Sequence, residues 1–114
     1  MSHRKLPEAR TVYRLGDAAG RYPVFSVEGA RRVEGRWHRA GASVIYAAVH
    51  YSTAVLEKLV YLGQMPPNQQ LVEIVLPQGI SYEVVTGDTV PGWYHKNGAE
   101  SRAFGNLWYE EQRS

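Results

Sequence analysis

The strongest structural pattern in the chain is a helical repeat of apolar residues between Ser52 and Gly63. The hydroxyl of Ser52 can accept hydrogen bonds from the free amides of a first helical turn, and Gly63 can take the left-handed conformation that ends many helices. We therefore predict a helix between these residues, with one apolar face packed against the rest of the chain. That face comprises Val55, Leu56, Leu59, Val60 and Leu62.

The segments around this helix favour strands at irregular intervals. Val44–Val49 is a continuous apolar run, which is typical of a buried central strand. Residues 16–32 are rich in glycine and arginine without a clear period, so we predict that they are mostly loop. Further strands are predicted at Thr11–Leu15, Leu71–Leu76 and Ser81–Val85, and a second helix at 99–108. The helices are too few for a doubly wound sheet, and we predict a mixed α+β fold.

Length and charge limit the possible classes of protein. The 114 residues suit a single domain spanning 1–114, and the net charge of +2 gives little support for a polyanionic partner. Residues 1–40 nevertheless hold nine Lys or Arg against four Asp or Glu, a local excess that suits a phosphate-bearing ligand or an acidic protein. Cysteine is absent, and no signal sequence or membrane-spanning run is seen, so we expect a cytoplasmic protein without a membrane segment.

Several common catalytic motifs are missing. The sequence has neither a glycine-rich phosphate loop ending in Lys-Ser/Thr nor a Gly-x-Gly-x-x-Gly fingerprint, and it has no Gly-x-Ser-x-Gly turn. The histidines are scattered, without carboxylates at metal-ligand spacing, so we expect no metal site. They are His3, His38, His50 and His95.

Three separate segments carry side chains with catalytic potential. On a helical wheel Glu57 lies at the border of the apolar face, where a partly desolvated carboxylate needs a salt bridge to an arginine or a hydrogen bond to Tyr61. Arg36 can lie flat on the indole of Trp37 or present paired donors to a pyrophosphate. Tyr46 can be a core residue or a stacking platform for a planar heterocycle.

The motifs in combination resemble the RES domain, a family named for an Arg, a Glu and a Ser. The resemblance covers most of the chain, and its segments come in the order found in the family. They are Tyr13–Leu15, Gly35–His38, Gly41 with Val44–Ala48, Ser52 with Ala54–Val60, Leu71–Pro77, Arg102–Trp108 and Arg113–Ser114.

The resemblance implies a fold like that of the ADP-ribosyltransferases, with a split mixed sheet and NAD bound as substrate in a cleft. It also implies a toxin that is partnered by an Xre-type antitoxin protein. Members of the family cleave NAD at the nicotinamide–ribose bond and either hydrolyse or phosphorolyse it or transfer ADP-ribose to a protein target. In the family the Ser is followed by a further strand, so we expect this chain, which stops at Ser114, to lack that strand.

The family motifs also imply roles for particular residues. Arg36 would bind the pyrophosphate, with Trp37 supporting its loop, and Tyr46 would stack against nicotinamide. Glu57 would stabilise the oxocarbenium-like ribose, and Ser114 would form a hydrogen bond near the nicotinamide or ribose. The motifs give less support to Arg14 as a further cleft residue. We expect the side chains of Arg36, Tyr46 and Glu57 to converge on one cleft.

Two other functions remain open on the sequence. The basic first third could bind nucleic acid through a set of aromatic side chains, but the low net charge leads us not to expect this. The chain could instead be a protein-interaction module without catalysis. The aromatic residues of the first alternative are Tyr13, Tyr22, Phe25 and Trp37.

Overall fold

The structure is a computed structural model that describes all residues except 1–3, 21–22, 25, 66 and 112–114; of residues 61 and 62 it describes only the backbone. The described residues combine short helices with small antiparallel sheets, so the predicted α+β class is confirmed. The strands are β1 (Arg4–Lys5), β2 (Arg10–Asp17), β3 (Gln69–Leu76) and β4 (Ser81–Tyr82), and the helices are α1 (Glu28–Arg32), α2 (Tyr51–Leu62) and α3 (Ala99–Glu110).

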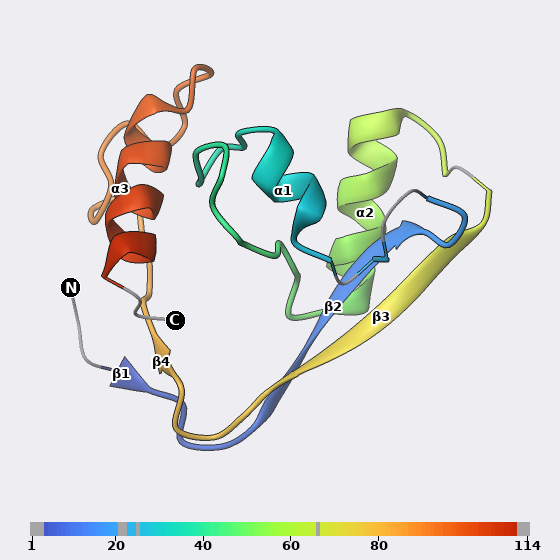
Figure 1. Cartoon of the computed structure of the whole chain (residues 1–114), viewed down its shortest axis with the longest axis horizontal. Helices are drawn as coiled ribbons and strands as arrows, with labels where there is room; N and C mark the ends of the chain where they lie inside the picture. The colour runs from blue at the N-terminus through green and yellow to red at the C-terminus, as the bar shows by residue number, and fades with distance from the viewer. Residues whose placement is uncertain (1–3, 21–22, 25, 66, 112–114) are drawn as a thin grey trace.

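The strands form one long, bent antiparallel ribbon (Figure 1). Strand β2 pairs with β3 along its whole length, and β1 pairs with β4 in the same register. Between the two pairs, the Leu6 amide donates to the Ile80 carbonyl over 2.9 Å. Pro7 and Pro77 lie in this interval, and because proline has no amide hydrogen they interrupt the ladder there.

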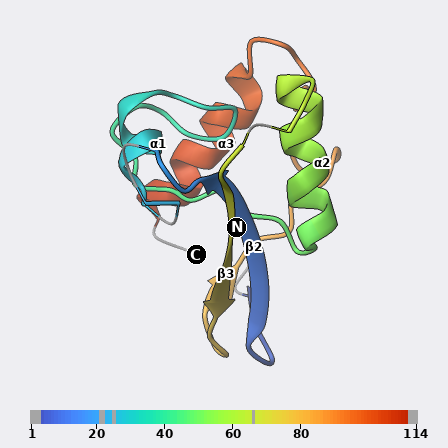
Figure 2. The same ribbon diagram turned by 90° about the vertical axis from the view of Figure 1, so that its right-hand side faces the viewer.

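Helix α2 packs against β2, but the predicted apolar face is only partly used, because Leu56 is 59% exposed and Val60 is 84% exposed. Ala54 is buried, and the ring of Tyr51 lies edge-on to that of Tyr13 with 6.2 Å between the centroids. The predicted end at Gly63 is confirmed, since Gly63 has φ 77° and its amide donates to the Leu59 carbonyl over 2.8 Å. The predicted Ser52 cap is wrong: the helix begins at Tyr51, and no side chain caps it. In Figure 2, α2 lies on one side of the ribbon, and α1 and α3 lie on the other.

The predicted central strand at Val44–Val49 is wrong. Only Ala48 forms a β-bridge, to Tyr13 of β2, and Ile45 and Val49 are exposed rather than buried. The reason is that side chains take the backbone groups a ladder would need. The Arg14 guanidinium donates to the Tyr46 carbonyl over 2.9 Å, and the Ser43 amide donates to the Tyr109 hydroxyl over 3.2 Å.

The other predicted elements differ from the structure mainly at their ends. The strands at Thr11–Leu15 and Leu71–Leu76 and the helix at 99–108 are confirmed, each slightly longer than predicted. The Ser81–Val85 strand stops at Tyr82. Residues 16–32, which we predicted to be mostly loop, contain the end of β2 and the short helix α1.

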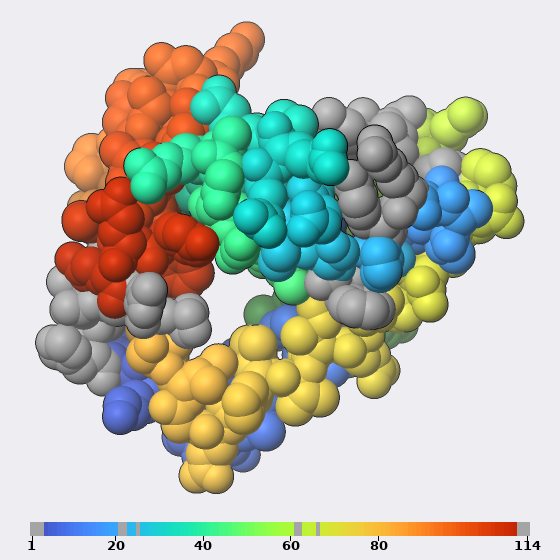
Figure 3. Space-filling view, viewed as in Figure 1, coloured from blue at the N-terminus to red at the C-terminus, as the bar shows by residue number. Residues whose placement is uncertain are grey.

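Packing is loose around the middle of the molecule. The buried apolar side chains among the described residues are small, namely Val24, Ala42, Ala54 and Val90. A largely apolar cavity of about 1120 Å³ separates the ribbon from α3, and Figure 3 shows a hollow in this place. Within the part of the chain that the structure describes, no helix has the length and apolar character needed to cross a membrane.

Candidate active site

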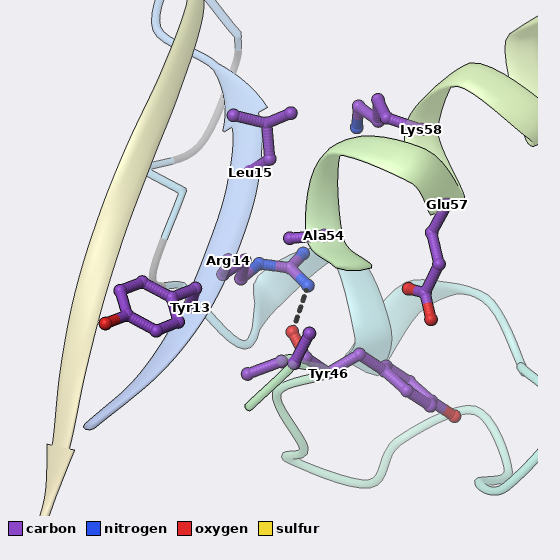
Figure 4. Close-up of a pocket in the computed structure, with 9 residues that line it drawn as sticks. Tyr13, Arg14, Leu15, Tyr46, Ala54, Glu57 and Lys58 are labelled. Atoms are coloured by element: carbon purple, nitrogen blue, oxygen red, sulfur yellow. Dashed lines mark hydrogen bonds between the residues drawn. The ribbon is translucent and has the colours of Figure 1, made fainter. Parts of the chain in front are cut away.

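A cavity of about 720 Å³ lies where β2, α2 and the segment before α2 meet (Figure 4). Its volume falls in the usual range for small-molecule sites. Three of the residues singled out in the sequence, Arg14, Tyr46 and Glu57, line it together. The other lining residues are Tyr13, Leu15, Ala47, Ala48, Ala54 and Lys58.

Helix α2 places the carboxylate of Glu57 at this cavity. Ala54 is buried against β2, and Glu57 follows it by three residues, so the two side chains leave the same side of the helix. We expected Glu57 to be partly desolvated and paired. The expected desolvation is wrong, because Glu57 is exposed, and no arginine that the structure describes pairs with it. The side chain of Tyr61, the other expected partner, lies outside the described part of the chain. In Figure 4 its carboxylate extends toward the Tyr46 side chain.

Arg14 connects the cavity wall to two other segments. Its Nε donates to the Val24 carbonyl over 2.6 Å, and its Nη1 donates to the Tyr46 carbonyl over 2.9 Å. Desolvation by burial lowers the pKa of this guanidinium from its ordinary value of 12.5. Since arginine keeps its proton in proteins, Arg14 brings a positive charge to the cavity and also holds the Tyr46 segment beside β2.

Tyr46 is fixed through its hydroxyl. The oxygen lies 2.7 Å from Nδ1 of His38 and accepts a hydrogen bond of 3.2 Å from the Trp37 amide. Burial raises the pKa of the Tyr46 phenol above its ordinary value of 10.0, while the bond from Trp37 and the charge of Arg102 act in the opposite direction. The phenol is therefore neutral near pH 7, and an aromatic ring beside the cavity is available for stacking.

The Gly35–His38 segment, which forms hydrogen bonds with the Tyr46 hydroxyl, packs tightly against α3. Arg102 Nε donates to the Gly35 carbonyl over 3.1 Å, and the indole of Trp37 lies edge-on to Phe104 at 6.4 Å. At Gly105 the helix meets the Trp37 carbonyl so closely that a side chain there would collide with it. Helix α3 therefore supports the Gly35–His38 segment on the side away from the cavity.

The guanidinium of Arg36 lies apart from the cavity residues. Its Nη1 donates to the carbonyls of Trp93 and His95 over 2.9 and 3.1 Å, and Arg36 does not line the cavity that holds Tyr46 and Glu57. The expected convergence of Arg36, Tyr46 and Glu57 is therefore met for the last two residues, and the pyrophosphate role of Arg36 stays a prediction. Ser114 lies outside the described residues.

Sequence reasoning missed two residues at the site. Lys58 lines the cavity, and the only signal for it was its place next to Glu57. His38 is buried, with 4% of its surface exposed, and contacts the Tyr46 hydroxyl. We treated it as a scattered histidine because nothing in the sequence indicates which side chain it meets. Among the described residues, no cluster of three or more His, Cys, Asp or Glu could hold a metal ion.

The sequence model of the RES domain matches residues 11–114, which includes every residue that lines the cavity. This chain belongs to the RES domain family. The predicted family resemblance is thereby confirmed.

Curated relatives of this RES domain are named as toxins. The Prs ADP-ribosylating toxin of Sphingobium sp. (strain YBL2) is 37% identical over 113 residues, covering 94% of this chain and 65% of the relative. Toxin Res of Pseudomonas putida is 40% identical over 76 residues, covering 63% of this chain and 52% of the relative. Toxin Res of Photorhabdus laumondii is 29% identical over 107 residues, covering 90% of this chain and 68% of the relative. This RES domain thus spans between half and about two thirds of the length of these relatives.

Proposed function

We propose that this RES domain is the NAD-cleaving part of a toxin and that it transfers ADP-ribose to a protein. The observation that carries the proposal is the cavity in which the carboxylate of Glu57, with no partner among the side chains that the structure describes, shares a wall with the Tyr46 ring and the cations of Arg14 and Lys58. A dinucleotide needs positive charge for its pyrophosphate and an aromatic surface for its nicotinamide. Its cleavage needs a negative charge near the ribose.

The proposed reaction begins at the bond between nicotinamide and C1′ of the ribose. The bond's electron pair leaves with nicotinamide, which becomes neutral, and positive charge develops on the ribose ring. The Glu57 carboxylate stabilises that charge, as carboxylates do in glycoside cleavage. A nucleophile then bonds to C1′ and gives up its proton, with water or phosphate yielding a small product and a protein side chain yielding a modified protein.

Positive charge at the cavity is suited to the pyrophosphate. Lys58 forms no hydrogen bond or ion pair with any residue that the structure describes, and Arg14 keeps donors beyond the two that bind carbonyls. We propose that both contact the pyrophosphate. Arg36 also keeps donors beyond Nη1, and we retain it as a further candidate for the same group.

Transfer is favoured over hydrolysis by the relative named Prs ADP-ribosylating toxin. The names of the relatives also support a toxin role, and an Xre-type antitoxin stays a predicted partner. The nucleic-acid alternative is less favoured because two of its aromatic residues pack within the protein, Tyr13 on Tyr51 and Trp37 on Phe104. The other two, Tyr22 and Phe25, lie outside the described residues.

The test is mass spectrometry of NAD incubated with the purified chain, alone and with a cell extract. We expect release of nicotinamide and a mass gain of one ADP-ribose on an extract protein, and Glu57→Gln lowers the release at least about 100-fold. The matched control is Glu8→Gln, which removes an exposed carboxylate that does not line the cavity. Free ADP-ribose without a modified protein would indicate hydrolysis. Intact NAD with the folded wild-type chain would refute cleavage, and salt-sensitive retention on RNA would then favour the alternative.

A further inference from the structure

His38 is buried next to the proposed site, and both of its ring nitrogens have hydrogen-bond partners. Its Nε2 lies 2.8 Å from the Ala30 carbonyl oxygen and 2.9 Å from that of Val33. Carbonyl oxygens can only accept hydrogen bonds, so Nε2 must carry a proton. In the neutral ring Nδ1 is then an acceptor.

This tautomer fixes the direction of the bond to Tyr46. With Nδ1 as acceptor at 2.7 Å, the Tyr46 hydroxyl donates its only proton to His38. The same oxygen accepts from the Trp37 amide over 3.2 Å, so both the position of the hydroxyl and its rotation about the C–O bond are set. The phenol proton is therefore directed at His38 and not into the cavity. Tyr46 thus presents its aromatic ring, and not its hydroxyl, to a ligand.

Gly35 makes this arrangement possible. A Cβ atom at this position would lie 2.9 Å from the Tyr46 hydroxyl oxygen and 2.9 Å from His38 Nδ1, closer than real Cβ atoms come to other atoms. The hydrogen-bonded pair thus occupies a space that only glycine leaves open.

We infer that His38 is a positioning residue for NAD cleavage, which holds the Tyr46 ring at a fixed angle beside Glu57 through an imidazole that donates from Nε2 and accepts at Nδ1. The inference rests on the proposed function for its chemistry. A small displacement of a group that orients the substrate can cost about 100-fold in rate, so loss of this bond lowers kcat.

Two substitutions separate this role from a purely structural one. In His38→Asn the amide oxygen takes the place of Nδ1 and can accept from Tyr46, but the bonds to Ala30 and Val33 are lost. In His38→Gln the terminal amide takes the place of Nε2 and can donate to those carbonyls, but Tyr46 loses its acceptor. We expect His38→Gln to lower kcat at least about 10-fold with KM changed less. His38→Asn, the conservative variant at Nδ1, is expected to keep most of the wild-type kcat.

A larger loss of kcat in His38→Asn than in His38→Gln would overturn the inference. It would show that the important bonds of His38 are those that anchor residues 30–33. A second readout is a double-mutant cycle: in a Tyr46→Phe background, His38→Gln lowers kcat no further. An additional 10-fold loss in that background would also overturn the inference.

A third readout does not depend on activity. ¹⁵N NMR of the histidine rings, assigned with His38→Gln, is expected to show the tautomer with its proton on Nε2, and a ring protonated at Nδ1 would overturn the inference. The two failures are distinguishable. Absence of nicotinamide release from wild type refutes the proposed function, whereas normal release together with full kcat in His38→Gln refutes only the role of His38.

Discussion

Lys58 and Glu57 are neighbours in the chain, but we propose opposite tasks for them, and this gives a residue-scale prediction. Lys58→Met is expected to raise KM for NAD about 10- to 100-fold, the value of one charge-assisted hydrogen bond, with a smaller change in kcat. Glu57→Gln is expected to act on kcat instead. Steady-state kinetics of nicotinamide release separate the two effects. Lys5→Met, an exposed lysine on β1, is the control, and equal effects of the two lysine changes would contradict the assignment.

Tyr46 and Tyr109 are expected to titrate on opposite sides of the ordinary tyrosine value of 10.0. Burial raises the pKa of Tyr46, and the hydrogen bond from the Ser43 amide lowers that of Tyr109. Ultraviolet difference titrations of wild type against Tyr46→Phe and Tyr109→Phe measure both values.

The raised pKa of Tyr46 has a consequence for stability. The unfolded chain releases this proton first, so the stabilisation due to Tyr46 is complete below pH 10.0 and is lost as the pH rises through the folded value. Urea unfolding at pH 9 and pH 11, compared between wild type and Tyr46→Phe, checks the sign. A wild-type advantage that grows at the higher pH would contradict it.

At the residue scale, the sequence indicated the acid but not what surrounds it. The border position of Glu57 marked it as a candidate carboxylate, and only the resemblance to the RES domain placed it at one site with Tyr46. The bond between His38 and Tyr46 could not be predicted, because it depends on the fold of the Gly35–His38 turn. Nor could the direction of the Arg36 side chain, which binds carbonyls 57 and 59 residues further along the chain.

At the scale of elements, the helices and strands with a regular apolar pattern were predicted correctly. Where the pattern was ambiguous, hydrogen bonds from side chains distant in sequence determined the structure. Helix α2 and strands β2 and β3 were predicted because their patterns repeat over several residues. Val44–Val49 has a strand-like composition, but a strand also requires a partner backbone. Here Arg14 occupies the carbonyl of Tyr46, so composition alone could not reveal the outcome.

The contact between α3 and the site segment gives an element-scale prediction. Glycine to alanine in a helix usually gains about 0.5–1 kcal/mol. At Gly105 the new methyl would meet the Trp37 carbonyl, so we expect Gly105→Ala to destabilise the fold by about 1–3 kcal/mol and to reduce NAD cleavage. Gly29→Ala, in α1 with no atom within 4 Å of the added carbon, is the matched control and is expected to be neutral or stabilising. Urea unfolding midpoints measure both, and equal midpoints would contradict the close packing.

At the scale of the whole molecule, the fold is unusually open for its size. Its exposed surface is 8033 Å², whereas a compact chain of 12.8 kDa exposes about 6,300 Å². The radius of gyration of 14.7 Å likewise exceeds the ~13 Å usual for this length. The apolar cavity between the ribbon and α3 accounts for part of this excess.

This openness predicts that the folded chain binds a hydrophobic dye. We expect dye fluorescence to rise with native protein at pH 7 and to fall when urea unfolds it, and the slope of the urea transition to be shallow because little surface is newly exposed. Ile45→Glu, at the apolar cavity between the ribbon and α3, is expected to reduce dye binding. Val60→Glu, at a residue of α2 that is 84% exposed, is expected to leave dye binding unchanged. Equal effects of the two variants would place the dye elsewhere.

The close approach of Gly105 to Trp37 joins parts of the chain that lie 68 positions apart in sequence. Hybrids made by exchanging α3 between this chain and its homologues would therefore be expected to fold only if the incoming helix carried glycine at this contact. The Gly35–His38 turn and helix α3 are therefore expected to be inherited together in recombinants, even though no residue of α3 lines the proposed NAD cavity.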